Sequence, residues 1–309
     1  MVLRAFLVAA AALVVLGCGA EKTRRHEVVR VHAATNSLVL VDAEANRVVA
    51  DVALGAAPRR VAFGDGAFWT DVPEDGLVVR VDARTHAVKR FRVGEDPFDV
   101  AVGGDAVWVP DHDRQVLFRV DPRTGRTRAS ANLGGPAVTA GFGLGAAWAV
   151  VAPGDLKRID PKTLAVTHTT TNVASTTEEA EPKLLFTRDR LLVVSPSSAW
   201  IARVDASGAS KGTRNVNGLT TGTLARSGLW LGNSAGFVGG HGVRVRVGYS
   251  PRDLTATGDD VWVAVYNESR MKRVDLDSGN VVATFALNRA PVAVAAGDDV
   301  VAVAVTAPL

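Results

Sequence analysis

The chain has 309 residues, of which 47% are hydrophobic and 22% charged, and its formal net charge is +3 at pH 7. This composition is that of a folded globular protein and argues against extended disorder. Because 35 Lys and Arg nearly balance 32 Asp and Glu, no polyanionic partner is required, and nucleic acid is not the expected ligand.

Residues 1–17 have the pattern of a secretory signal peptide. Arg4 gives a positive start, and residues 5–16 are an unbroken apolar stretch, too short to span a bilayer as a helix. The stretch ends in Val15-Leu16-Gly17-Cys18, which resembles the lipobox of bacterial lipoproteins. The resemblance implies that Cys18, the only Cys in the chain, is lipidated and becomes the new N-terminus. An ordinary signal peptide followed by an incidental Cys is the alternative.

Lipidation at Cys18 implies an extracytoplasmic protein held on a membrane, periplasmic or on the outer face of the cell, because two acyl chains anchor a folded domain stably. We expect a short linker at residues 18–26 and a single folded unit at residues 27–309. The mature part has no second Cys, so the fold must close without a disulfide.

From residue 27 onward the sequence repeats with a period of about 40 residues. Short apolar runs end in an Asp at nearly constant spacing, namely at Asp42, Asp82, Asp121, Asp160, Asp205 and Asp275. One unit, residues 97–134, divides into four β-like runs at 98–102, 106–110, 116–121 and 126–133. Four short strands in a unit of this length are typical of a β-propeller blade.

First strands near residues 58, 97, 136, 182, 219, 251 and 291 predict an all-β, seven-bladed propeller of four-stranded antiparallel blades. The chain begins with third and fourth strands (37–42 and 47–54) and ends with first and second strands (292–296 and 300–305). The two ends are therefore expected to share the last blade, which removes the open sheet edge of a broken ring. The run 28–32 either adds to this closing blade or competes with residues 300–305, and both alternatives stay open.

Two segments carry a family resemblance. Residues 36–66 (NSLVLVDAEANRVVADVALGAAPRRVAFGDG) and 261–299 resemble the YVTN-type repeat of YncE-like periplasmic propellers, surface-layer propellers and streptogramin lyases. The tetrapeptide that names the group is represented by FWTD, VWVP and VWVA. The resemblance covers roughly residues 27–305 and implies architecture, because no catalytic group belongs to the repeat itself.

The repeated Asp and Trp residues are expected to be structural. An Asp at the end of a third strand caps the following turn by accepting backbone hydrogen bonds, and these residues lie too far from the axis to converge on a metal. Trp residues recur in the second strands, where they fill the space between adjacent sheets: Trp69, Trp108, Trp148, Trp230 and Trp262. A ring of metal ligands and an aromatic ligand platform are the respective alternatives.

The channel mouth is the expected ligand site, because loops on a rigid scaffold carry function. The loops after second strands (71–76, 110–115 and 266–270) and the approaches to first strands supply ten candidates: Arg59, Asp99, Asp111, His112, Asp113, Arg252, Asp253, Tyr266, Asn267 and Glu268. Such mixed charge suits a polar ligand, or a divalent cation on the carboxylates. No other cofactor is expected, and simple solvation of the loops is the alternative.

Two further features stand out from the repeat. The fourth unit contains an insertion at 168–182, rich in Thr and Glu, which is either a special contact or a tolerated loop. Basic residues crowd the outer hairpins of the second and third units, between Arg80 and Arg128. Charged outer strands block aggregation through sheet edges; contact with anionic lipid is a further option.

Three functions are consistent with these features. The first is a non-enzymatic, monomeric binding or scaffold lipoprotein of the cell envelope that takes a polar ligand or a protein at the channel mouth or rim. The second is a metal-dependent lyase or hydrolase, because the run AVWVPDHDRQVLFRVDPRTG resembles streptogramin lyases, which implies a metal held by His and Glu. However, no His follows a repeat proline at the channel. The third is DNA binding, as a YncE-like propeller.

Overall fold

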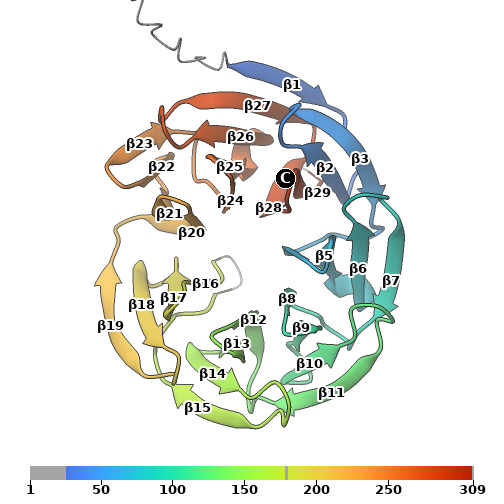
Figure 1. The fold of residues 1–309 in the computed structure, drawn as a ribbon, viewed down its shortest axis with the longest axis vertical. Coiled ribbons are helices and arrows are strands. Elements are labelled where there is room, and N and C mark those ends of the chain that lie inside the picture. Colours follow the sequence, from blue (N-terminus) through green and yellow to red (C-terminus); the bar gives the residue numbers. More distant parts are fainter. Residues whose placement is uncertain (1–25, 178–179, 308–309) are drawn as a thin grey trace, which may run out of the picture.

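Seven β-sheets are arranged around one axis as the blades of a propeller (Figure 1). The computed structural model describes residues 26–177 and 180–307, so the predicted signal peptide, the lipidation site Cys18 and nearly all of the linker lie outside the described residues. The predicted all-β class, the seven blades and the four antiparallel strands per blade are confirmed.

In blades 1 to 6 four antiparallel strands follow the chain from the axis outward. Blade 1 consists of β4 (Val61–Gly64), β5 (Ala67–Val72), β6 (Leu77–Asp82) and β7 (Val88–Arg92). Blade 2 consists of β8 (Ala101–Gly103), β9 (Ala106–Asp111), β10 (Val116–Val120) and β11 (Thr127–Asn132). Blade 3 consists of β12 (Ala137–Gly143), β13 (Ala146–Val151), β14 (Asp155–Ile159) and β15 (Val166–Thr170). Blade 4 consists of β16 (Lys183–Phe186), β17 (Arg190–Ser195), β18 (Trp200–Asp205) and β19 (Ser210–Asn215). Blade 5 consists of β20 (Leu219–Ala225), β21 (Gly228–Asn233), β22 (Phe237–Gly240) and β23 (Val243–Arg246). Blade 6 contains β24 (Asp253–Thr257), β25 (Asp260–Val265), β26 (Arg270–Asp275) and β27 (Val281–Leu287).

Blade 7 is built from both ends of the folded chain, as predicted. Its strands, in order from the axis, are β28 (Ala290–Ala296), β29 (Val300–Thr306), β2 (Ser37–Asp42) and β3 (Arg47–Ala53). β2 and β29 pair antiparallel along their length, from Ser37 opposite Val305 to Asp42 opposite Val300. This pairing joins the ends and leaves the ring without an open edge between its first and last blades.

Residues 28–32 occupy a place that neither alternative from the sequence foresaw. β1 (Glu27–Val31) neither joins the closing blade nor competes with β29; it pairs parallel with β27 as a fifth, outermost strand of blade 6. The physical reason is the apolar face of blade 6: Val31 is buried and Val29 partly buried against the cluster that includes Phe285 and Leu287. Figure 1 shows β1 on the outside of β27.

Pairs of adjacent blades enclose the core. The five second-strand Trp side chains are 0–1% exposed, which confirms their predicted packing role. In blades 1 to 3 each indole nitrogen also donates to a first-strand carbonyl, at Gly64 (3.2 Å), Gly103 (3.0 Å) and Gly143 (3.0 Å). The indoles therefore fill the gap between sheets and fix the first strand to the second.

The repeated Asp residues cap turns, as predicted. Oδ1 of Asp121 accepts the backbone N–H groups of Arg123 (2.8 Å) and Thr124 (3.0 Å), and Asp42, Asp82 and Asp160 make the same pair of bonds two and three residues on.

The two short 3₁₀ helices, η1 (Pro73–Asp75) and η2 (Tyr266–Glu268), lie in loops after second strands. Within residues 26–177 and 180–307, helices are too short and too polar to cross a bilayer.

Candidate functional site

The first strands of all seven blades surround a central channel. Residues of these strands line a cavity of about 320 Å³ that runs from Arg60 and Lys183 at one end to Phe63, Phe142 and Phe186 at the other. The loops after second strands and the approaches to first strands meet at the Arg60 end, because the antiparallel order brings them to the same face of every blade. We call this end the channel mouth.

The insertion between blades 3 and 4 supplies a buried carboxylate to the mouth. Glu181 has a side chain only 3% exposed and forms ion pairs with both Arg59 and Arg60, which precede β4 of blade 1. Arg59 Nε donates to Glu181 Oε1 at 2.8 Å. The end of the insertion therefore meets blade 1 across the channel. Figure 1 shows the loop that precedes β16 extending from blade 4 toward the axis.

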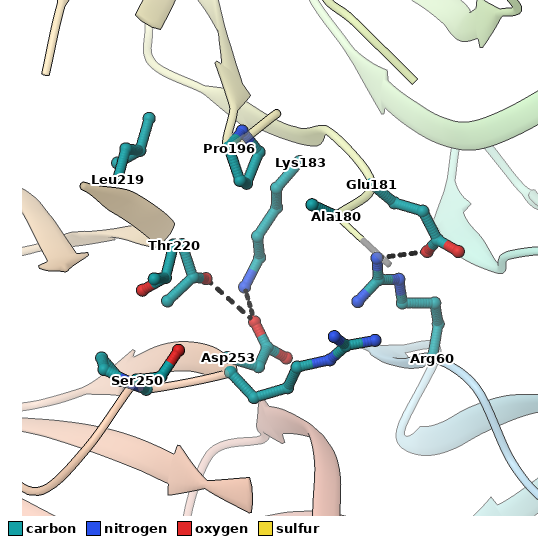
Figure 2. A pocket seen from close by; sticks show the side chains of 12 residues that line it. Arg60, Ala180, Glu181, Lys183, Pro196, Leu219, Thr220, Ser250 and Asp253 are labelled. Carbon is teal, nitrogen blue, oxygen red and sulfur yellow. Dashed lines mark hydrogen bonds and ion pairs between the residues drawn. The ribbon is translucent and has the colours of Figure 1, made fainter. Parts of the chain in front are cut away.

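Lys183 and Asp253 form a second ion pair at the mouth. Lys183 Nζ lies 2.6 Å from Asp253 Oδ1 and 2.6 Å from the carbonyl oxygen of Leu254. Figure 2 shows Lys183 pointing toward Asp253 and Arg60 pointing toward Glu181, on two sides of one hollow. The pair ties blade 4 to blade 6 across blade 5.

Two Asp residues join adjacent blades: Asp253 is the first residue of β24, and Asp99 lies just before β8. Asp253 Oδ2 accepts the backbone N–H of Val294 (2.9 Å) in blade 7. Asp99 Oδ2 makes the equivalent bond to Ala140 N (3.0 Å) in blade 3, and Thr139 Oγ1 donates to the same oxygen at 2.5 Å. Each carboxylate thus satisfies a backbone donor of the next blade that no sheet ladder reaches.

Burial and neighbouring charges shift the pKa values of ionisable groups near the channel mouth. The pKa of Asp71 rises to about 8 because the side chain is fully buried and lies near Asp99; its Oδ1 accepts Arg60 N at 2.8 Å, while Oδ2 has no hydrogen-bond partner within the part of the chain that the structure describes. Burial also raises the pKa of Asp99. For Arg60, burial opposes the charged form, but the carboxylates of Glu181, Asp99, Asp253 and Asp71 outweigh it and hold the pKa above its ordinary value.

A hollow opens beside these charges, between blades 4, 5 and 6. It has a volume of about 200 Å³, and its walls combine cations, hydroxyl groups and apolar side chains: Arg60, Ala180, Glu181, Lys183, Pro196, Leu219, Thr220, Thr221, Ser250, Pro251, Arg252 and Asp253 (Figure 2). We call it the mouth pocket. Burial, and then the charge of Arg60, lower the pKa of Arg252.

A separate stack of side chains lies on the blade 2 side of the mouth. The Arg59 guanidinium lies 3.5 Å from the centre of the Phe98 ring, and the His112 ring stacks on Phe98 at 4.9 Å between centroids. His112 Nδ1 is 3.8 Å from Asp96 Oδ2 and 3.7 Å from Asp113 Oδ1. One ligand atom from each of these last three residues falls within 4.8 Å of the others, so their donor types fit a divalent cation.

The structure divides the ten predicted residues into separate groups. Arg252 and Asp253 line the mouth pocket, while Arg59 is joined to that group through Glu181. His112 and Asp113 belong to the stack, and Asp99 lies buried between blades 2 and 3. The remaining predicted residues lie at the end of β9 and in η2: Asp111, Tyr266, Asn267 and Glu268.

The carboxylates of Asp111 and Glu268 accept hydrogen bonds from backbone N–H groups. Asp111 is fully buried and accepts the N–H groups of Glu95 (2.7 Å) and Arg114 (2.8 Å), so it shapes the loop that carries His112. Glu268 accepts Tyr249 N at 2.9 Å, while Tyr266 and Asn267 are the first residues of η2.

Sequence reasoning did not include Arg60, Glu181 and Lys183 among the ten candidates. A signal existed for each of them. Lys183 directly follows a repeat proline, and Glu181 belongs to the only long insertion. Arg60 lies with Arg59 in the approach to a first strand, which is the same positional signal. No sequence signal shows which Glu of the insertion reaches the channel.

Comparison with known proteins identifies the fold and no family. No family model matches the chain, and no curated protein matches its sequence. Solved structures of similar fold include Kuenenia stuttgartiensis hydrazine synthase (TM-score 0.66, 14% identity, 82% of this chain and 96% of that chain covered) and the β-propeller domain of Myceliophteria thermophila Cps50 (Swd1) (0.62, 13%, 81% and 96%). BamB from Moraxella catarrhalis is also similar (0.55, 15%, 79% and 95%). At these identities the likeness shows a propeller and carries no activity.

Proposed function

We propose that this protein is a non-enzymatic binding protein of the cell envelope, tethered to a membrane through Cys18, which takes a polar ligand at the channel mouth. A general binding or scaffold role is what the propeller fold supports. The observation that carries the proposal is the convergence of buried charges from blades 1, 4 and 6 on one open pocket. Buried ion pairs contribute little net stability to a fold, so the position of these pairs beside an open pocket favours a binding role.

Membership of the YncE-like propellers and the lipoprotein address are parts of the same proposal. The first is supported by the repeat segments 36–66 and 261–299, and the second by the apolar stretch that ends in Val15-Leu16-Gly17-Cys18. Labelled palmitate should enter the wild-type chain and fail to enter the Cys18→Ser chain. Incorporation into both, or into neither, would remove the membrane tether from the proposal.

Thermal unfolding of the full chain in non-ionic detergent tests the binding role. A set of small anions, cations and neutral sugars is added to wild type, to the mouth variant Arg252→Gln and to the rim control Arg123→Gln, which loses the same charge on the opposite face. At least one ligand should raise the unfolding temperature of wild type and of the rim control more than that of the mouth variant. Stabilisation that only the rim control loses would place binding elsewhere.

The second candidate is a metal-dependent lyase or hydrolase, favoured by the grouping of Asp96, His112 and Asp113. Metal analysis of purified chain compares wild type with the His112→Ala variant. Stoichiometric metal that is lost with His112 would favour the enzyme. DNA binding is the weakest candidate. Two of the basic residues in the outer hairpins, Arg80 and Arg128, already form ion pairs with the turn residues Asp82 and Asp121.

A further inference from the structure

The mouth pocket has an arrangement of charges that favours an anion. Lys183 pairs with Asp253 and Arg60 with Glu181, and Arg252, which lies near the charges of Glu181 and Asp253, adds a third cation to the same wall. Arg252 and Arg60 repel each other, and this repulsion, after burial, lowers the pKa of Arg252. A negative group placed beside Arg252 would offset that repulsion in a site partly removed from water, where charge interactions are stronger than in bulk solvent. Hydroxyl groups of Thr220 and Ser250 in the pocket wall suit the oxygens of such a group.

The same pocket continues into the channel cavity, whose wall mixes polar and apolar side chains near the mouth and is aromatic at its far end. Arg60, Lys183 and Asp253 line both the mouth pocket and the channel cavity, so the two spaces meet at these residues. Farther from the mouth, the cavity is bordered by Phe63, Phe142 and Phe186.

These rings are held in fixed positions by glycines of the preceding blade. A Cβ at Gly103 would lie 2.6 Å from the Phe142 ring, and one at Gly143 would lie 2.3 Å from the Phe186 ring. Such close packing requires glycine and leaves the rings a stable apolar wall. The charged mouth and the aromatic wall are therefore independent features at two ends of one space.

We propose that the channel mouth binds a small amphipathic organic anion, with a carboxylate at Arg252, Arg60 and Lys183 and a short apolar chain directed into the channel. This inference rests on the proposed function and specifies its ligand class. The volumes of about 200 Å³ and 320 Å³ fit a ligand of a few carbon atoms. The apolar wall distinguishes an organic anion from inorganic phosphate, which would gain nothing from it.

Calorimetric titration of the full chain in non-ionic detergent tests the proposal with a probe series. Hexanoate is compared with acetate, which has only the head group, with 1-hexanol, which has only the chain, and with inorganic phosphate. Between acetate and hexanoate the affinity should rise up to about fourfold per added CH₂, because each buried CH₂ contributes about 0.8 kcal/mol. Hexanol and phosphate should each bind at least about tenfold more weakly than hexanoate, as expected for loss of one charge-assisted contact or of the apolar contact.

Two variants locate the site. Arg252→Gln should weaken hexanoate binding about tenfold or more, while Arg123→Gln, on the opposite face, should leave it unchanged. The chain-length series in wild type needs no variant and stays informative if Arg252→Gln fails to fold. Equal affinity for acetate and hexanoate, equal binding of hexanol, or full hexanoate affinity in Arg252→Gln would each overturn the proposal. If cations or sugars bind at the mouth while no carboxylate does, the proposed binding role stands and only this ligand class is wrong.

Discussion

At the scale of single residues, aspartates serve two different purposes in this protein. Asp82 and its counterparts lie at outer turns, where backbone N–H groups hold the ionised form. Asp71 and Asp99 are buried beside the channel, where loss of water favours the neutral form and raises the pKa of each. The same side chain therefore makes stability depend on pH in opposite directions at the two places.

The turn aspartates should make the protein sensitive to acid. Hydrogen bonds, first of all from the backbone N–H of Thr85, lower the pKa of Asp82 to about 2, and the pKa values of Asp121, Asp160 and Asp205 are also lowered. Their stabilisation is present above the ordinary pKa of 3.8 and is lost as the pH falls toward 2. Urea unfolding between pH 5 and 2 should show this loss, and the Asp82→Asn variant should show a smaller one. An equal loss in both proteins would refute the assignment.

Asp71 should act with the opposite sign. Its pKa in the folded protein is about 8, so the folded chain retains a proton that the unfolded chain releases near 3.8. The free energy of unfolding therefore falls as the pH rises from about 4 to about 8 through this residue, and Asp99 contributes in the same direction. An Asp71→Asn variant keeps an acceptor for Arg60 N and should lose part of this decline in urea unfolding. A decline as steep as that of wild type would contradict the burial of an ionisable Asp71.

The Asp253 carboxylate should hold blades 6 and 7 together. In Asp253→Asn an amide replaces an oxygen that accepts Val294 N, and Lys183 loses its charged partner. We expect a loss of about 1–3 kcal/mol in the free energy of unfolding, as for other buried groups left without a partner. Part of the loss should return in Asp253→Asn/Lys183→Met, because the Lys183 ammonium then no longer faces an amide in place of its carboxylate partner. No recovery would mean that the backbone contact alone carries the effect.

Residue types that the repeat imposes could be predicted from the sequence, and contacts between blades at the channel could not. The turn role of Asp121 and the packing role of Trp148 follow from local pattern, because every unit repeats the same surroundings. Glu181 meets Arg59 and Arg60 over a separation of about 120 residues, and only the closed ring brings these segments together. Periodicity places the strands, but it contains no information on which loop side chain crosses the axis.

At the scale of elements, the second strand is buried along its whole length in blades 1, 2, 3 and 6. β13 of blade 3 is buried along its whole length, and Trp148 fills the space between adjacent sheets. Trp148→Ala should lower the free energy of unfolding by about 3–5 kcal/mol, as for other large-to-small changes in a core. Trp200, which is only partly buried at the start of a third strand, is the matched control and should lose less in urea unfolding. Equal losses would show that burial in the second strand is not the cause.

β1 protects the outer edge of blade 6, although the sequence did not predict its partner. Its register follows from a local apolar match, with Val31 opposite Leu287. Asp substitutions at Val29 and Val31 should detach β1 and expose the edge of β27, which promotes association between chains. Light scattering should detect this association, whereas the same substitution at Val28, which is 60% exposed, should leave the chain unchanged.

At the scale of the whole molecule, the direction of β1 relates the proposed membrane anchor to the channel mouth. Glu27 Oε2 accepts from Asn46 in an outer turn of blade 7, on the face opposite the mouth, and Ala33 N donates to Asn288 at the mouth face. The chain therefore enters the propeller from the far face. The nine residues from Cys18 to His26 reach at most about 30 Å. We expect the mouth to face away from the membrane, open to ligands.

Single-cysteine probes test this orientation. In a chain that keeps Cys18 for the anchor, a fluorophore at Asp65→Cys in a far-face turn should be quenched by a lipid-borne quencher in vesicles. The same fluorophore at Asn267→Cys, in η2 at the mouth, should not be quenched. Stronger quenching at the mouth would reverse the orientation.

Amide hydrogen exchange with and without saturating hexanoate tests the central claim, that the channel mouth is the binding site, most directly. We predict slower exchange in peptides that cover residues 180–186, 219–222 and 250–254, with no change in the outer turn at 121–126. Slower exchange confined to the outer turns or to the β1 edge, with the mouth unaffected, would contradict the account.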